Sequence, residues 1–284
     1  MRKLPSEPEY IRERRLIREK IERDKRYFVY LCVVLAIAAV FLVALFINSS
    51  PLIENIKYKL NDIDCEILVP DFDYGDGIYF ECEDETVLVD SGSSRHYEEL
   101  IDFIKSNNIK NLNYLMITEV SEEYLQTLEE LLNYTDVSKI IVPGEADKSL
   151  VELYDNLIFS KGSLFLTSDK ITYFTLGKMK FYIMDSQNLS LDICFGNHNF
   201  FVLNGEKLEH MNIKSKPDVL FLKNSDLLKN EILEMLNPKN CIVNSVLNDD
   251  LQISKKYSLF KTKTDGDIIV TSDEVTLKIN TGKR

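Results

Sequence analysis

Short hydrophobic stretches separated by polar turns run along the chain from about residue 65 onwards. Strict alternation of hydrophobic and polar residues indicates strands, whereas a repeat of about 3.6 residues indicates helices. Tyr97, Leu100, Ile101 and Ile104 have the helical spacing. In this half the pattern predicts strands at Cys65–Val69, Ile78–Glu83, Thr86–Asp90, Leu112–Thr118 and Lys139–Val142, and helices at Tyr97–Asn107 and Ser121–Asn133.

The second half is predicted to be richer in strands. We expect helices at Ala146–Tyr154 and Asp226–Leu236, a closing strand pair within Lys261–Ile279, and strands at Ile171–Thr175, Lys180–Met184, Leu191–Phe195, Phe200–Leu203, Val219–Leu222 and Cys241–Ser245. Two similar halves, each with sheet inside and helices outside, predict an α/β fold built as a four-layer αββα sandwich. No long linker separates the halves, so one domain is expected over residues 60–284.

Phe28–Ile47 is a segment of twenty residues without a charged side chain. As a helix it would be about 30 Å long, which matches the hydrocarbon core of a bilayer. A cleaved signal peptide is the alternative, but its apolar run is shorter and ends at a small-residue cleavage site. Asn48–Ser50 offers only a weak site of that kind. We therefore predict a transmembrane helix at residues 28–47, between a basic tail at 1–27 and a connector at 48–59.

The charges that flank this segment predict its orientation. Arg12–Arg26 contains eight basic residues, whereas Asn48–Asp62 contains only Lys57 and Lys59. Basic flanks stay in the cytoplasm, so we expect the N-terminus inside the cell and the C-terminal domain outside it. The side chains of Arg12–Arg26 are also candidates for contact with anionic lipid headgroups. The prediction is a single-pass protein of the cell membrane.

Acidic residues predominate outside the basic tail. The formal net charge of the whole chain is −12, but residues 1–27 carry +4, which leaves −16 for the remainder. Nucleic-acid affinity comes largely from Lys and Arg side chains that neutralise phosphates. We therefore expect no nucleic-acid partner, which argues against a nuclease or a DNA receptor.

Five cysteines are scattered along the chain without the Cys-x-x-Cys spacing of a zinc or redox site. Cys32 lies in the predicted membrane helix, and Cys194 and Cys241 have no cysteine nearby. Cys65 and Cys82 belong to neighbouring predicted strands and can face each other, and an extracytoplasmic location permits disulfides. Buried free thiols are the preferred interpretation, and pairing of Cys65 with Cys82 is the alternative.

Three motifs, taken in order, are similar to those of one family. Asp71–Asp76 reads Asp-Phe-Asp-Tyr-Gly-Asp, Leu88–Gly92 reads Leu-Val-Asp-Ser-Gly, and Thr264–Ser272 begins Thr-Asp-Gly-Asp. They resemble the Asp-Val-Gly-Gln-Gly-Asp turn, the Leu-Ile-Asp-Thr-Gly motif and the closing hairpin of the β-lactamase-like domain in the ComEC/Rec2 competence family. The resemblance covers nearly all of residues 60–284. It implies the metallo-β-lactamase fold and, in active relatives, a zinc site that acidifies a water molecule.

The resemblance also indicates where the metal ligands would lie, and this sequence departs from the family there. The family's Thr-His-x-His-x-Asp-His pattern corresponds to residues 118–124, so its ligand positions are occupied by Glu119, Ser121, Glu123 and Tyr124. The bridging Asp of the family corresponds to Glu206, and its late His-His-Gly-Ser stretch begins here with Lys223 and Asn224. Asp90 keeps its place in the Leu-Val-Asp-Ser-Gly motif.

This set of side chains does not suit zinc. Ser121 is a poor ligand, and Lys223 brings a positive charge to the place of a cation. We expect that the ancestral zinc site is lost, with no catalytic residue, no bound metal and no other cofactor. Glu119, Glu123 and Glu206 could bind a hard cation such as Ca²⁺ or Mg²⁺ through oxygens, but a solvated acidic edge is the simpler interpretation.

The three histidines, His96, His198 and His210, do not replace the missing ligands. Each is expected to lie at the surface or to support its neighbours by packing. The leading interpretation is therefore a membrane-anchored, catalytically inactive metallo-β-lactamase-like domain that binds or scaffolds an unknown envelope protein. The alternative is a metal-dependent hydrolase of the phosphodiesterase or nuclease type with an unusual carboxylate-rich site.

Overall fold

The structure is a computed structural model that describes residues 20, 64–72, 76–90, 97–144, 147–205, 211, 213, 215–223, 225–243 and 256–282, without the side chains of residues 123 and 225. The chain divides into two units, Met1–Asp62 and Ile63–Arg284, and the fold described below belongs to the second. The predicted tail, transmembrane helix and connector lie outside the described residues, apart from Lys20. None of the described helices has the length and hydrophobicity needed to cross a membrane.

The first sheet has eight strands in the order β15-β14-β1-β2-β3-β4-β5-β6. Neighbours are antiparallel from β15 to β3 and parallel from β3 to β6. The strands are β1 (Cys65–Val69), β2 (Ile78–Cys82), β3 (Glu85–Val89), β4 (Asn111–Met116), β5 (Asp136–Val142), β6 (Leu164–Thr167), β14 (Asp267–Ser272) and β15 (Leu277–Gly282). The C-terminal hairpin therefore completes the sheet beside β1.

The second sheet has seven strands in the order β13-β12-β11-β10-β9-β8-β7. Neighbours are antiparallel from β7 to β10 and parallel from β10 to β13. The strands are β7 (Tyr173–Leu176), β8 (Met179–Asp185), β9 (Ser190–Phe195), β10 (His198–Leu203), β11 (Val219–Leu222), β12 (Asn240–Val243) and β13 (Ser258–Lys261). Both sheets thus follow one plan, with an antiparallel half that continues into a parallel half.

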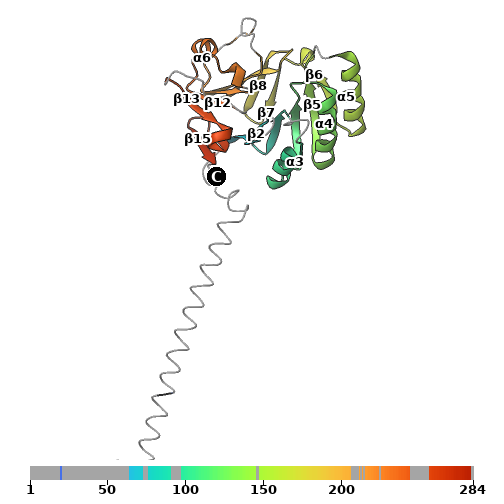
Figure 1. Cartoon of the computed structure of the whole chain (residues 1–284), viewed down its shortest axis with the longest axis horizontal. Helices are drawn as coiled ribbons and strands as arrows, with labels where there is room; N and C mark the ends of the chain where they lie inside the picture. The colour runs from blue at the N-terminus through green and yellow to red at the C-terminus, as the bar shows by residue number, and fades with distance from the viewer. Residues whose placement is uncertain are drawn as a thin grey trace, which may run out of the picture. The chain divides into compact units, whose positions relative to one another are not determined.

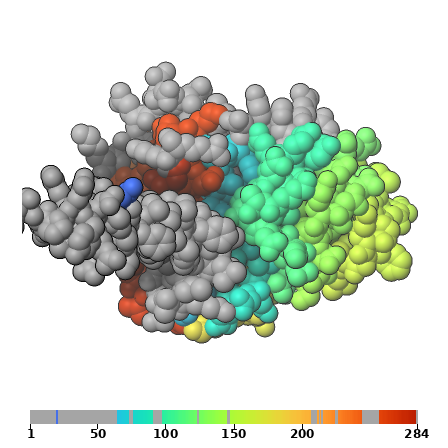
Figure 2. Space-filling view, turned by 90° about the horizontal axis from the view of Figure 1, so that it is seen from below, coloured from blue at the N-terminus to red at the C-terminus, as the bar shows by residue number. Residues whose placement is uncertain are grey.

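Helices connect the parallel strands, because such strands need a crossover between them. In the first sheet the crossovers are α3 (Tyr97–Ser106), α4 (Glu122–Tyr134) and α5 (Lys148–Ser160), and in the second α6 (Asn230–Leu236) joins β11 to β12. Figure 1 shows α3, α4 and α5 on one flank of the domain and α6 on the other. In Figure 2 the segments from α3 to α5 form a continuous green to yellow-green surface. The short elements are η1 (Ser168–Lys170), η2 (Ser225–Leu227) and α7 (Thr262–Asp265).

Three hydrophobic clusters hold these layers together. In the central cluster, between the sheets, the ring of Phe80 in β2 lies 5.3 Å from that of Phe181 in β8 and 6.2 Å from that of Phe221 in β11. A second cluster packs α3, α4 and α5 against the outer face of the first sheet, and a third packs α6 against the second sheet. The predicted mixed α/β fold with two sheets is confirmed.

Local sequence explains where the helices of the first sheet begin. The Ser121 hydroxyl accepts a hydrogen bond from the backbone N–H of Tyr124 and so caps α4. The carboxylate of Asp147 caps α5 by accepting from the N–H groups of Ser149 and Leu150. Such caps satisfy backbone donors that have no partner inside the helix.

Several element boundaries differ from the predictions. The helix predicted at Ala146–Tyr154 is α5, which continues to Ser160, and the four-residue strand β6 was not predicted. The helix predicted over Asp226–Leu236 is shorter than expected. Lys229 has extended backbone angles, so the α-helix α6 begins only after it, at Asn230. The segment predicted as a closing strand pair also contains the end of β13 and the helical turn α7.

Candidate functional site

The side chain of Lys223 lies at the centre of a polar cluster formed with Asp76, Asp90 and Thr118, which we call the Lys223 cluster. Its Nζ atom is 3.2 Å from Oδ2 of Asp90 and 3.6 Å from Oδ2 of Asp76, and it donates a 2.5 Å hydrogen bond to Oγ1 of Thr118. The side chains of Lys223, Asp76 and Asp90 are only 20%, 16% and 10% exposed. The charges are therefore largely removed from water.

The ends of two parallel strands place Asp90 and Thr118 side by side. Asp90 follows β3 directly, and Thr118 lies just beyond the end of β4. The backbone N–H of Asp90 donates to the carbonyl oxygen of Met116, and Oδ1 of Asp90 accepts from both the N–H and the hydroxyl of Thr118, at 2.9 and 2.6 Å. Asp90 has φ +63°, a left-handed conformation that Asp tolerates better than most residues.

Lys223 reaches this edge from the second sheet. It follows β11, and its backbone N–H donates to the carbonyl oxygen of Leu203 at the end of β10. Asp76 lies just before β2, so the cluster combines three residues of the first sheet with one of the second. The carboxyl-terminal ends of parallel strands are where α/β proteins most often assemble their sites.

Burial and the neighbouring charges shift the pKa values of Lys223 and Asp76. Burial alone would lower the pKa of Lys223, but the negative charges of Asp90 and Asp76 outweigh it and raise that pKa above its ordinary value. Burial raises the pKa of Asp76 to about 7, against the opposing attraction of Lys223. Lys223 is thus a stable cation at neutral pH, whereas Asp76 exchanges a proton near neutrality.

The pKa values of two tyrosines close to Glu119 are shifted by their surroundings. The hydroxyl of Tyr154 in α5 donates to the carbonyl oxygen of Ser121 at 2.8 Å. Burial raises the pKa of Tyr154 to about 12. Burial and the negative charges of Glu119 and Asp76 raise the pKa of Tyr124. Both tyrosines are therefore neutral hydrogen-bonding groups at physiological pH.

The structure separates the predicted site residues into different roles. Asp90 and Lys223 lie in the cluster, Ser121 caps α4, and Glu119 is exposed to solvent. Tyr124 is partly buried in the first turn of α4. The side chain of Glu123 and the residues Glu206 and Asn224 lie outside the described part of the chain, as do His96 and His210.

Sequence reasoning did not select Asp76 and Thr118 as site residues. Asp76 is the last residue of the Asp71–Asp76 motif, and Thr118 ends the hydrophobic run that contains β4. The sequence places each of these polar residues at or near the end of a predicted strand, and that position could have marked them as candidates. It does not show that Lys223 contacts both of them.

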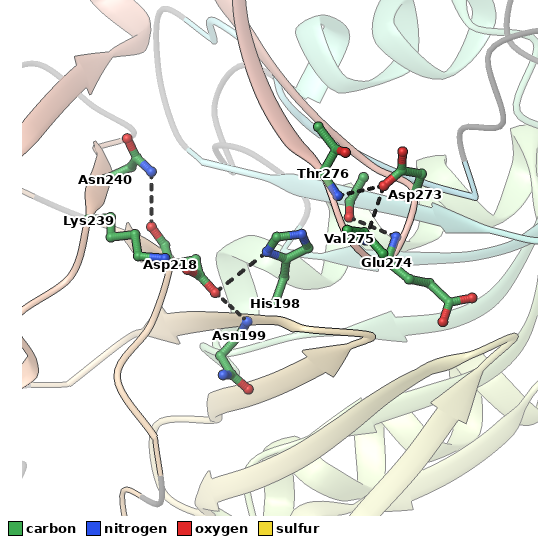
Figure 3. A network of polar contacts seen from close by, with 10 residues as sticks. His198, Asn199, Asp218, Lys239, Asn240, Asp273, Glu274, Val275 and Thr276 are labelled. Carbon is green, nitrogen blue, oxygen red and sulfur yellow. Dashed lines mark hydrogen bonds and ion pairs between the residues drawn. The ribbon is translucent and has the colours of Figure 1, made fainter.

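A second polar network, shown in Figure 3, lies at the start of β10, β11 and β12. His198 is the first residue of β10, and its Nδ1 atom is 3.7 Å from Oδ2 of Asp218. Asp218 also accepts from Nζ of Lys239 at 2.6 Å and from the backbone N–H of Asn199 at 3.0 Å. These bonds lower the pKa of Asp218, although its burial acts in the opposite direction. The network joins strand ends of the second sheet, away from the carboxyl-terminal ends that carry the Lys223 cluster.

The donor set of the Lys223 cluster does not fit a zinc ion. Zinc in proteins is held by deprotonated Cys, His and carboxylate groups, whereas here an ammonium group lies against the two carboxylates. Within the described part of the chain, no group of three or more His, Cys, Asp or Glu residues is arranged to hold a metal ion. The ammonium group is also no general base, because it stays protonated.

Comparison with known proteins identifies the fold. No protein-family description and no curated protein sequence matches the chain. Among solved structures, the metallo-β-lactamase fold protein YhfI from Bacillus subtilis matches with a TM-score of 0.52 at 11% identity, covering 74% of this chain and 100% of that one. A diphosphatase of the PhnP family matches with a TM-score of 0.45 at 11% identity, covering 69% and 94%. The match to YhfI shows that the chain has the metallo-β-lactamase fold.

Proposed function

We propose that this chain is a membrane-anchored, non-catalytic metallo-β-lactamase-fold protein whose outer domain binds a partner protein at the cell envelope. The observation that carries the proposal is the ammonium group of Lys223 against Asp76 and Asp90. Lys223 stands where the resemblance places the late histidines of the family, so it brings a positive charge to the place of a metal ion. The Thr118 hydroxyl donates to Asp90 and accepts from Lys223, so it is engaged as both donor and acceptor within the cluster.

The family assignment within the fold is also part of the proposal. The motifs Asp71–Asp76 and Leu88–Gly92 resemble those of the ComEC/Rec2 β-lactamase-like domain. In support, their acidic residues Asp76 and Asp90 contact the same ammonium group, so the two motifs meet at one edge of the domain. We assign the four-layer αββα sandwich of that family to residues 60–284.

The location follows from the N-terminal sequence. The uncharged segment Phe28–Ile47 anchors the chain, and the basic residues of Arg12–Arg26 keep the N-terminus in the cytoplasm, where they contact anionic lipid headgroups. The acidic outer domain then faces the envelope and binds protein rather than nucleic acid.

Metal content and turnover of the purified full chain test the absence of catalysis. We expect substoichiometric zinc and manganese by elemental analysis, and thermal melts that coincide with and without EDTA. Chromogenic phosphodiester and β-lactam substrates should be hydrolysed no faster than in buffer containing the same metal. Stoichiometric metal together with turnover that Asp90→Ala abolishes would instead establish the metal-dependent hydrolase.

Site-specific photo-crosslinking in intact cells tests partner binding. Position 119 is exposed and lies beside Thr118 of the cluster, so a photoreactive amino acid there reports on contacts made at this edge. We expect one discrete crosslinked protein, which weakens with Lys223→Met and persists with Lys148→Met, an exposed lysine at the start of α5. Equal crosslinking in both variants would mean that the Lys223 cluster does not contribute to partner binding.

A further inference from the structure

Cys65 in β1 and Cys82 in β2 lie directly opposite each other in the antiparallel register. Their side chains point to the same face, into the core between the two sheets, where they are 1% and 0% exposed. Opposite residues of antiparallel strands have Cα atoms about 4.5–5.5 Å apart. Disulfides bridge Cα separations of about 4.4–6.8 Å. The backbone is thus already positioned for a bond between these two residues.

The other described cysteines have no such neighbour. Cys194 is opposite Lys180 and Asn199, and Cys241 lies between Leu220 and Leu259, as the strand registers show. Of the four cysteines that the structure describes, only Cys65 and Cys82 are register partners. The pairing is therefore specific to one position in the fold.

We propose that Cys65 and Cys82 form a disulfide bond when the chain folds in an oxidising compartment. The two thiols release two protons and two electrons as the bond between their Sγ atoms forms, and a disulfide-class oxidant accepts them and is reduced to two thiols. The bond links β1 to β2 inside the core. Its formation in cells rests on the proposed location of the domain outside the membrane, whereas its formation in the purified protein does not.

Folding and oxidation are coupled in this arrangement. The Sγ atom of Cys65 lies 3.5 Å from Sδ of Met179, so β8 covers the pair on the side of the second sheet. Burial raises the pKa values of both thiols, and thiolates are the species that react. The folded reduced protein therefore reacts slowly, and the bond forms while the strands are still assembling.

Oxidative refolding of the purified full chain in detergent micelles tests the proposal. The denatured protein is refolded with a mixture of reduced and oxidised glutathione, quenched with acid, alkylated and digested. We expect one peptide pair joined through Cys65 and Cys82. The melting temperature of the oxidised protein should fall by about 5–10 °C when reductant is added, because the bond restricts the unfolded chain. The folded reduced protein should form the bond at least about tenfold more slowly than the refolding protein, since its thiols are buried.

Matched variants make the result decisive. Cys241→Ser removes an equally buried cysteine of the second sheet and should keep the reductant-dependent shift, whereas Cys82→Ala and Cys65→Ser should lose it. Comparing each variant with and without reductant separates the bond from any loss of packing. Refolded wild type that carries free thiols at both positions overturns the proposal. The thiols of Cys65 and Cys82 are also analysed in cells quenched with acid. If the disulfide forms in vitro but both thiols are free in cells, the external location is contradicted, whereas the proposed pairing still stands.

Discussion

The Nζ atom of Lys223 lies 3.2 Å from Oδ2 of Asp90, although the two residues belong to different sheets. The other carboxylate oxygen of Asp90 accepts from Thr118, so both oxygens are engaged. Such charges depend on each other, because a carboxylate that loses its counter-ion inside a protein has no water to replace it. This contact therefore connects the sheets and sets the charge of the site.

Replacing Lys223 with methionine tests that dependence. The substitution keeps the length of the side chain but leaves Asp76 and Asp90 without their cation. We expect the free energy of unfolding to fall by about 2–4 kcal/mol, since the pair is mostly but not fully buried. Thermal melts of the full chain would show this as a loss of about 5–10 °C.

Two control variants separate charge from packing. Lys223→Arg retains the cation and should lose less than half as much stability as Lys223→Met. Lys148→Met removes an exposed lysine and should change the free energy of unfolding by less than about 0.5 kcal/mol. If Lys223→Met and Lys148→Met melt at the same temperature, the cluster does not stabilise the domain.

The raised pKa of Asp76 predicts a dependence of stability on pH. In the folded protein this carboxyl has a pKa of about 7, whereas its ordinary value is 3.8. The folded state therefore binds more protons than the unfolded state between these values, and stability from this group falls as the pH rises through them. Asparagine has no proton to lose. The melting temperature of Asp76→Asn, relative to that of the wild type, should therefore rise by about 3–8 °C as the pH is raised from 5 to 8.

The melting temperature of the wild type is subtracted from that of the variant at each pH. This difference removes the contribution of all other titrating groups. Asp155→Asn, the same substitution at an exposed position of α5, is measured in parallel as the matched control. A pH-independent difference for Asp76→Asn would mean that this carboxyl is ionised throughout the range.

The sequence predicted those site residues that lie within short motifs. Asp90 and Lys223 were selected because each follows a hydrophobic strand within a motif that resembles the family. Their contact was not predictable, because hydrophobic periodicity identifies strands but not which strand ends meet across two sheets. Thr118 and Lys223 are 105 residues apart in the chain and adjacent in the fold.

The fold shows the same limit. Strands β1, β2 and β3 were predicted within one or two residues, since their buried faces give a clear pattern. The strand β6 was missed, because it lies at the edge of its sheet and all four residues keep partial or full exposure. The pairing of β14 with β1 joins opposite ends of the domain sequence and leaves no local signal.

Protease accessibility tests the predicted topology. The chain is expressed with one epitope before Met1 and another after Arg284, and protease is added to intact spheroplasts. We expect loss of the C-terminal epitope and retention of the N-terminal one, since basic flanks stay in the cytoplasm. Detergent-permeabilised spheroplasts, in which both epitopes should disappear, show that the tail is cleavable. A protected C-terminal epitope in intact spheroplasts contradicts an external domain.

Rebuilding the first ligand cluster is not expected to produce a hydrolase. The quadruple variant carries Glu119→His, Ser121→His, Glu123→Asp and Tyr124→His. It supplies imidazoles and a carboxylate that can hold zinc, but the ammonium group of Lys223 still lies against Asp90. We expect weak zinc binding by calorimetry and no turnover of a chromogenic phosphodiester, because catalysis is sensitive to misplacement of about 1 Å.

A fifth change, Lys223→His, then isolates the effect of the ammonium group. It removes the positive charge and adds a ligand, so zinc should bind at least about tenfold more tightly than to the quadruple variant. The single variant Ser121→His serves as a stability control, because it also removes the N-cap of α4 and should cost about 1 kcal/mol. Equal zinc affinity with and without Lys223→His would mean that the lysine does not occupy the place of a cation.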